Sequence, residues 1–521
     1  MMPAETPTTV RAGRSVGAAQ RTGAAGAISR AWSRRVAMAP VAAMLATLSV
    51  ASVVAGAATP PPAVTGATAA AAAAPALRMP DYRRVVLPNG VVLLMMPLRE
   101  VPMVAFTAVL RGGALGVPQD RAGLASLAAG LLEKGAGARD AFQFADAVAG
   151  AGGRLATAAG AESITLSGQF LARDRELMVG LLADALLRPR LDAVEFDKLR
   201  ARQVELIRAA KDSDPSGLLD DYGRALLFGA HPYGQPVDGT ERTLAAVTHA
   251  DLREFWDTRL GADRLTLVFA GDLDPAWLEA AVRRAFGALG RARVALPPLP
   301  EPRRVAGRRV LLVDSPGAAQ TYFWIANVGV ARRYPARAAL DIVNTLYGGR
   351  FTSILNTELR IKSGLSYGAR SAFVRGSVAG EFAISSFAQT ENTARAVDLA
   401  LETLGRLRRE PVAAPVLQSG RAYVLGQYPL RLETAAHWAG QLADLEFYGL
   451  DRRYVEGYGP ALAEVGLEDT RRVIDEAFPS PDDVVMVLVG DAAKIRDSIR
   501  HYGPLSEIAL AAPDLLPAPG R

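Results

Sequence analysis

The chain has 521 residues, of which 50% are hydrophobic and 21% charged, so it can bury a large core and is not a disordered protein. The absence of cysteine excludes a disulfide framework, a thiolate metal site and a cysteine nucleophile. Residues 1–58 carry a charge of +5 out of the net +6, so the rest of the chain is almost neutral and does not indicate a nucleic-acid partner.

Residues 1–58 have the pattern of an export signal. An apolar stretch, residues 36–58, follows Arg34 and Arg35 and ends in the small residues Ala55-Gly56-Ala57, which suit a signal peptidase. The stretch is also long enough to cross a bilayer, which takes about 20 apolar residues. A cleaved signal peptide and an uncleaved membrane anchor are therefore both open, and both predict a periplasmic protein, free or anchored to the inner membrane. An Ala- and Pro-rich linker, residues 59–77, follows.

The folded part begins with strands. Asn89-Gly90 between two apolar runs predicts a hairpin over residues 83–94, because both turn positions favour positive φ. A further strand is predicted over residues 102–110. Hydrophobic periodicity then predicts helices over residues 122–132, 140–149, 173–187 and 194–211, the last ending before Asp214-Pro215.

One pattern occurs twice in the chain. A helix beginning at Asp251 leads into an apolar strand that ends in Gly271-Asp272, and a helix beginning at Asp469 leads into one that ends in Gly490-Asp491. A Pro-rich segment lies between the two copies. We predict an α+β fold of two homologous domains, residues 78–292 and 305–512, joined by a linker of residues 293–304. Each domain is expected to be a mostly antiparallel sheet covered by helices.

The segment from Gly364 to Gly368 matches the G-x-S-x-G pattern of a serine nucleophile, with Ser366 at its centre. A nucleophile elbow needs a strand before the serine and a helix after it. Here residues 352–361 predict a helix before it, and Tyr367 begins a strand-like alternation. His437 and His501 are the only downstream histidines that could act as base. A serine hydrolase stays an alternative that this context disfavours.

Taken together, the motifs resemble the insulinase/pitrilysin-like family of inverted zincins, which includes the processing peptidases. The resemblance extends from about Tyr82 to Tyr502. It rests on the Leu-Pro-Asn-Gly hairpin, the Gly-Leu-Ala segment from Gly123, His231-Pro-Tyr-Gly, the paired Gly-Asp strand ends, and the segment from Gly348 to Tyr367. It implies that the two domains form a half-clamshell like that of the processing peptidases.

The zinc motif of that family is missing. Laid on this sequence, the family's H-x-x-E-H falls on Ser126, Ala129 and Gly130, and its more distant glutamate ligand falls near Glu205. Zinc in such a site lowers the pKa of its water to about 7 and polarises the scissile carbonyl. A hydroxyl, a methyl group and a hydrogen atom provide neither metal ligands nor a base. We therefore expect no metal cofactor in this chain and no peptide hydrolysis by the chain alone.

The second domain keeps two residues of the family's site. The resemblance implies that Arg360 and Tyr367, seven residues apart, hold the substrate backbone and stabilise the oxyanion. It further implies a zinc-less subunit of an exported two-component metallopeptidase, paired as a heterodimer or larger assembly with a chain that carries H-x-x-E-H and zinc, and acting on a peptide. The alternative is a non-catalytic scaffold or assembly protein of the same fold.

Overall fold

The computed structural model describes residues 77–517. The export signal or membrane anchor predicted for residues 1–58, and almost all of the linker 59–77, lie outside these residues. Among the described residues, no helix is both long and apolar enough to cross a membrane.

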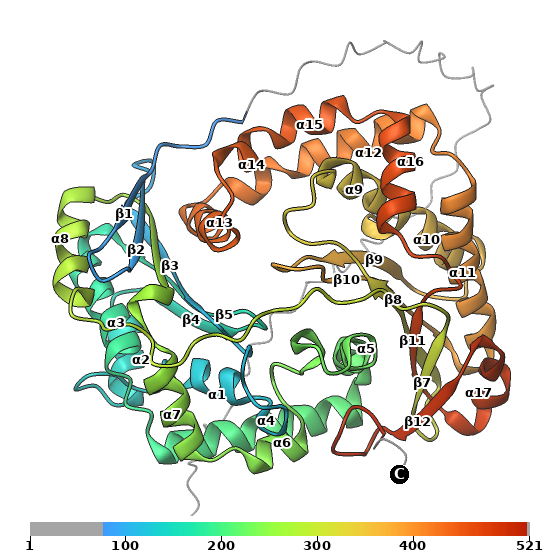
Figure 1. Cartoon of the computed structure of the whole chain (residues 1–521), viewed down its shortest axis with the longest axis horizontal. Helices are drawn as coiled ribbons and strands as arrows, with labels where there is room; N and C mark the ends of the chain where they lie inside the picture. Colours follow the sequence, from blue (N-terminus) through green and yellow to red (C-terminus); the bar gives the residue numbers. More distant parts are fainter. Residues whose placement is uncertain (1–76, 518–521) are drawn as a thin grey trace, which may run out of the picture. The chain divides into compact units, whose positions relative to one another are not determined.

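The first half of the described chain builds a six-stranded mixed sheet with the strand order β1-β2-β6-β3-β5-β4 (Figure 1). Only β2 and β6 are parallel neighbours. Gly90 has a φ of 104° in the turn between β1 and β2, so the predicted hairpin is confirmed. The strands are β1 (Arg83–Val86), β2 (Val92–Pro97), β3 (Met103–Arg111), β4 (Arg154–Ala159), β5 (Ser163–Leu171) and β6 (Leu265–Gly271).

The second half builds a second six-stranded sheet, in the order β12-β7-β11-β8-β10-β9. Five of its strands repeat the pairing of β2-β6-β3-β5-β4, with β7 and β11 parallel like β2 and β6. The sixth strand differs, because β12 is parallel to β7 whereas β1 is antiparallel to β2. The predicted repeat and α+β fold are thus confirmed. The strands are β7 (Arg309–Asp314), β8 (Gln320–Val328), β9 (Ala369–Val374), β10 (Glu381–Gln389), β11 (Val485–Gly490) and β12 (Leu505–Ala509).

Helices cover both sheets. Those of the first half are α1 (Leu124–Leu131), α2 (Ala141–Gly150), α3 (Arg175–Leu187), α4 (Ala193–Ser213), α5 (Leu219–Phe228), α6 (Glu241–Ala246), α7 (His249–Arg259) and α8 (Pro275–Phe286). The four helices predicted between residues 122 and 211 correspond to α1 to α4, with ends that agree within two residues.

The second half contributes the remaining helices. The helix predicted over residues 352–361 is α10 (Ile354–Asn356) continued by a π-helical turn, Thr357–Lys362, and a second π-helical turn, Thr345–Gly349, precedes it. The others are α9 (Arg337–Asn344), α11 (Thr393–Arg409), α12 (Ala414–Gln427), α13 (Ala435–Tyr448), α14 (Arg452–Glu456), α15 (Tyr458–Glu464), α16 (Leu467–Ala477) and α17 (Ala492–Ile499).

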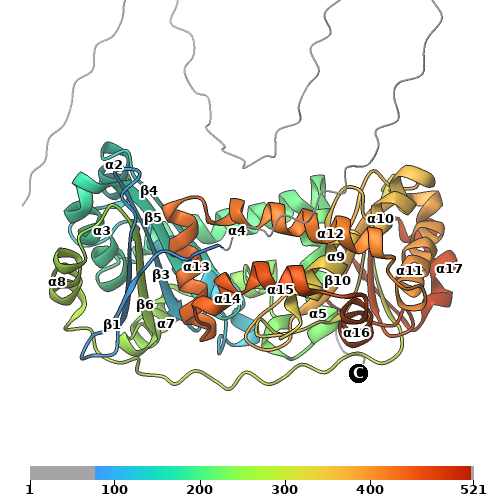
Figure 2. The same cartoon turned by 90° about the horizontal axis from the view of Figure 1, so that it is seen from above.

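Each sheet takes one covering helix from the other half of the chain (Figures 1 and 2). Helix α5 packs on β8 and β11, and Tyr222 is fully buried beside Trp324 in this layer. The approach is close, because a Cβ on Gly223 would lie 2.6 Å from the Trp324 ring. Helix α13 packs on β3 and β6, with Leu442 buried against Val268. Strands β6 and β11 are buried along their whole length because helices cover both faces.

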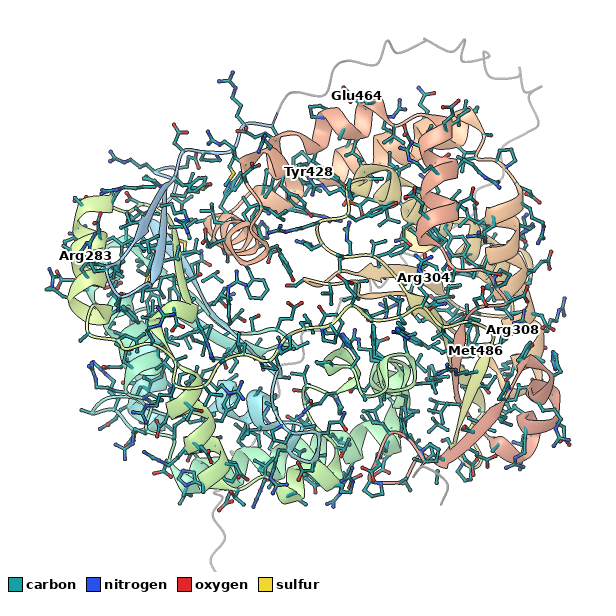
Figure 3. All side chains as sticks on the ribbon, viewed as in Figure 1. Arg283, Arg304, Arg308, Tyr428, Glu464 and Met486 are labelled. Atoms are coloured by element: carbon teal, nitrogen blue, oxygen red, sulfur yellow. The ribbon has the colours of Figure 1, made fainter. Side chains whose placement is uncertain are left out.

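An extended segment joins the two halves, as Figure 2 shows. Arg304 and Arg308, labelled in Figure 3, lie at its C-terminal end. Arg304 donates to the Glu476 carbonyl at 2.6 Å, and Arg308 donates to the Pro481 carbonyl at 2.9 Å. Nearer its middle, the Nε2–H of His231 donates to the Pro300 carbonyl, while Nδ1 accepts the Tyr233 amide. Both nitrogens of His231 are therefore used in holding the fold.

Candidate functional site

The positions of the family's zinc motif lie on α1. The Ser126 hydroxyl donates to Oδ1 of Asp238 at 2.6 Å, and Ala129 is buried in the core. Gly130 lies against α4, where a Cβ would come within 2.8 Å of Cδ2 of Leu199. The three positions offer no imidazole and no carboxylate, so they do not fit a zinc ion.

The fourth ligand position is not completed either. Glu205 is exposed on α4 and forms an ion pair with Arg208 at 2.8 Å. It follows Leu199 by six residues, which places it about 240° around the helix from the face that meets α1. Within residues 77–517, no group of three or more His, Asp or Glu side chains is arranged to hold a metal ion.

Arg360 and Tyr367, together called the clasp below, are brought together. Arg360 belongs to the π-helical turn Thr357–Lys362, which ends where the Ser363 hydroxyl donates to the Glu358 carbonyl. Gly364, with a φ of 64°, then reverses the chain toward β9. The Arg360 guanidinium carbon lies 4.3 Å from the ring centroid of Tyr367. Tyr367 is 74% exposed, so the clasp is open to solvent.

Ser366 is not presented as a nucleophile. Its hydroxyl is buried, donates to the Gly368 carbonyl at 2.8 Å and lies 3.0 Å from the hydroxyl of Ser386. In the described part of the chain, no hydrogen bond joins it to a histidine. A helix precedes it and a strand follows it, as the sequence predicts, and this order is the reverse of a nucleophile elbow.

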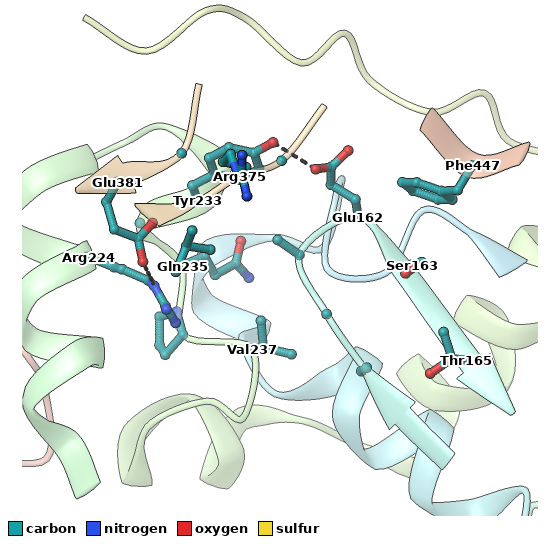
Figure 4. A pocket seen from close by; sticks show the side chains of 18 of the residues that line it. Glu162, Ser163, Thr165, Arg224, Tyr233, Gln235, Val237, Arg375, Glu381 and Phe447 are labelled. Atoms are coloured by element: carbon teal, nitrogen blue, oxygen red, sulfur yellow. Dashed lines mark hydrogen bonds and ion pairs between the residues drawn. The ribbon is translucent and has the colours of Figure 1, made fainter. Parts of the chain in front are cut away.

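A cavity of about 470 Å³ lies where the two halves meet (Figure 4). Its walls come from the β4–β5 turn, from residues 233–238, from the β9–β10 turn and from the end of α13. A volume of this size suits a small ligand or a short stretch of peptide. Its charged lining residues are Glu162, Asp221, Arg224, Asp238, Arg375, Glu381 and Asp444.

Most of these charges are held in pairs. Nε of Arg224 lies 2.9 Å from the Glu381 carboxylate, and the Tyr233 hydroxyl donates to Glu162 at 2.8 Å (Figure 4). Burial raises the pKa of Glu381, although Arg224 opposes this shift. Burial also raises the pKa of Asp221 to about 6, against the attraction of Arg224. Sequence reasoning missed this cavity because its residues are scattered along the chain and share no motif.

The clasp and the cavity are separate places. Asp238, the partner of Ser126, lines the cavity, whereas Arg360 and Tyr367 do not. Strand β9 runs from the clasp to the cavity rim at Arg375, a span of roughly 25 Å at the rise of a strand. The structure therefore places the clasp and the missing zinc motif at different sites of one chain.

Known proteins are similar to this chain in sequence. Residues 246–418 match the family described as the peptidase M16 inactive domain. An uncharacterized zinc protease of Mycobacterium leprae is 28% identical over 403 residues, which are 77% of this chain and 87% of that protein. The non-peptidase homolog YmxG of Helicobacter pylori is 22% identical over 398 residues, covering 76% of this chain and 90% of that protein.

Solved structures agree on the fold. The peptidase M16 inactive domain from Pseudomonas fluorescens superposes with a TM-score of 0.73 at 23% identity, over 79% of this chain and 98% of that chain. A protease from Helicobacter pylori gives 0.72 at 19% identity, over 79% and 100%. The resemblance to the insulinase/pitrilysin-like peptidases is confirmed: residues 246–418 match the inactive-domain family, and about three quarters of the chain is similar to proteins named as zinc proteases or as a non-peptidase homolog. The solved structures share its fold, and its sequence lacks H-x-x-E-H.

Proposed function

We propose that this chain is the non-zinc-binding subunit of an exported two-component peptidase, and that its clasp serves a site whose zinc and base belong to a partner chain with H-x-x-E-H. The observation that carries the proposal is the exposed contact between Arg360 and Tyr367. It occurs in a chain whose residues 77–517 hold no group of side chains arranged for a metal ion. A clasp of this kind has no substrate chemistry to perform unless a second chain supplies the rest.

The donors of the clasp are free to bind. Among the described residues, no carboxylate forms an ion pair with Arg360, and no acceptor takes the Tyr367 hydroxyl. A guanidinium and a phenol that point at developing negative charge are the donors that stabilise a tetrahedral transition state. Loss of one such donor costs about 2.7–4 kcal/mol in comparable sites.

The location of the clasp supports a site shared between chains. The clasp and the cavity lie at opposite ends of β9. Asp238, which contacts motif position Ser126, lines that cavity. The clasp is therefore too far away to form one site with the motif positions of its own chain. A complete site would instead form between two chains of this fold that face each other. One chain would provide H-x-x-E-H and the other would provide the clasp. The substrate of such an assembly is an extended peptide.

A scaffold role is the second candidate. It is favoured by the similarity to a non-peptidase homolog and by the match to the inactive domain. The two candidates differ in one respect, because a scaffold needs its surface but does not need the N–H and O–H groups of the clasp.

The first experiment is affinity purification of the full chain from the organism that encodes it. The peptidase proposal expects an H-x-x-E-H chain to co-purify in a fixed ratio, and the purified pair to cleave peptides that neither chain cleaves alone. Arg360→Ala should abolish the cleavage without loss of the partner, whereas Arg453→Ala, an exposed arginine paired with Asp451, should change nothing. Absence of any such partner, or an active pair with Arg360→Ala, would leave the scaffold role.

Export is part of the proposal and has its own test. A periplasmic protein with a cut leader should begin close after residue 57, as N-terminal sequencing of the native protein will show. An anchored protein should keep residues 36–58 and sediment with the membranes. Recovery of the full-length chain from the cytoplasmic fraction contradicts both forms of the proposal.

A further inference from the structure

A second aromatic ring contacts the clasp. The guanidinium carbon of Arg360 lies 4.8 Å from the ring centroid of Phe351, besides its contact of 4.3 Å with Tyr367. Phe351 is 62% exposed, so its ring is not explained by burial in the core. The contact that this ring makes with the Arg360 guanidinium is a cation–π interaction, and it gives the exposed Phe351 side chain a role.

A buried amide fixes Phe351 relative to Tyr367. The Asn356 side chain, only 4% exposed, donates through Nδ2 to the Phe351 carbonyl at 2.6 Å and accepts through Oδ1 the Ala369 amide at 3.2 Å. Ala369 begins β9 two residues after Tyr367. The Asn356 side chain therefore links the backbone of Phe351 to the start of β9, two residues after Tyr367.

The contact with two rings leaves the binding groups of Arg360 available. Aromatic rings stack on the face of a guanidinium, whereas its five N–H donors lie in its plane. A long side chain without such contacts samples many rotamers, and this freedom is lost whenever it binds a substrate. Because the two rings already restrict the rotamers of Arg360 in the unbound chain, less conformational entropy is lost when its N–H groups bind substrate.

We propose that Phe351 is a positioning residue of the clasp: its ring, held in register with Tyr367 by Asn356, fixes the Arg360 guanidinium in the orientation that binds substrate. This inference rests on the proposed function, because it assigns a role within the same site. Phe351 acts through Arg360 and does not itself take part in the reaction.

Kinetics of the reconstituted pair give the first test. Phe351→Ala should lower kcat roughly fivefold, the scale of one cation–π contact, with a smaller change in KM. Phe351→Tyr should restore kcat to within twofold, whereas Phe351→Leu, which keeps apolar bulk without a π-face, should not. Phe142→Ala, which removes an 80% exposed ring on α2, is the matched control and should leave kcat unchanged.

A second test needs no partner and no activity. In the isolated full chain with labelled arginine, the Arg360 side-chain NMR signal, assigned through Arg360→Lys, should show a ring-current shift and slow exchange. Phe351→Ala and Asn356→Ala should both reduce the shift and speed the exchange. An unchanged Arg360 signal in folded Phe351→Ala overturns the inference, as does restoration of kcat by Phe351→Leu. Failure of the proposed function would give a different result. In that case, Arg360→Ala would itself leave the activity of the pair intact.

Discussion

The Cβ that any residue other than glycine brings to position 130 lies 2.8 Å from Cδ2 of Leu199. Position 130 is where the family's second histidine falls, and any side chain there would have to displace the tip of Leu199 on α4. The contact between α1 and α4 at this position therefore has room for glycine, and a larger residue would require Leu199 to move.

Restoring the motif should not restore the metal. We expect Ser126→His, Ala129→Glu and Gly130→His, combined, to destabilise the fold by at least about 1–3 kcal/mol. Ala129 is buried, so a carboxylate there would lose its water, and a side chain at position 130 would displace the tip of Leu199. Because Glu205 lies on another face of α4, the family's third ligand is not in place. Adding Leu199→Ala should recover part of the stability without stoichiometric zinc. Denaturant unfolding and metal analysis measure both, and one tightly bound zinc per chain in the triple variant would falsify this account of the site.

The close approach of α5 to the second sheet predicts a contrast between two glycines. Gly223→Ala places a methyl group 2.6 Å from the Trp324 ring, and we expect a loss of about 1–3 kcal/mol. Gly426→Ala, inside α12, meets nothing within 4 Å and should be neutral or stabilising by up to about 1 kcal/mol. Urea unfolding of both variants provides the comparison. Equal effects would show that the α5 packing does not limit stability.

Because α5 and α13 each pack on the sheet of the other half, we expect the two halves of the chain to unfold together. Leu442→Ala removes a fully buried side chain of α13 from the face of the first sheet and should cost about 2–5 kcal/mol. Although the mutation lies in the second half of the chain, thermal unfolding should remain one transition at a lower temperature. His437→Ala, on the exposed side of the same helix, is the control. Two separated transitions in calorimetry contradict the interlocked arrangement.

Asp221 predicts how stability depends on pH. Burial raises the pKa of this carboxyl to about 6 in the folded chain, compared with about 3.9 when it is unfolded. Between these values the folded state keeps a proton that the unfolded state has lost, so stability falls as the pH rises from about 4 to 6. Asp221→Asn should remove this fall and gain roughly 1–2 kcal/mol near pH 7.

An exposed carboxyl on another helix serves as the control for that experiment. Asp146 lies exposed on α2, and Asp146→Asn should leave the pH profile of the wild type in place. If both variants keep the same decline between pH 4 and 6, Asp221 is not its source.

Local elements of this fold follow from the sequence because their signals are local. The turn at Asn89-Gly90, the capped start of α4 at Asp192 and the repeated strand ends at Gly271 and Gly490 each depend on a few neighbouring residues. The convergence of Arg360 and Tyr367 was also predictable, because Ser363-Gly364 breaks the helix between them.

Other features depend on which distant surfaces meet. Periodicity shows that α5 and α13 have apolar faces, but it does not show that each covers the sheet of the other half. The cavity joins Glu162 to Tyr233 across the chain, and no short motif marks such a pair. The hydrogen bonds of Asn356 are likewise invisible in sequence, since both of its partners are backbone groups.

The most direct measurement of the central claim is the rate of peptide cleavage by the pair reconstituted with Tyr367→Phe. This change removes one hydroxyl and keeps the ring that contacts Arg360. We predict that kcat falls about 10²- to 10³-fold, as for loss of one oxyanion donor, while assembly with the partner is unchanged. Tyr423→Phe, at another exposed ring, should have no effect. A Tyr367→Phe pair with the wild-type rate contradicts the claim that this chain takes part in the chemistry.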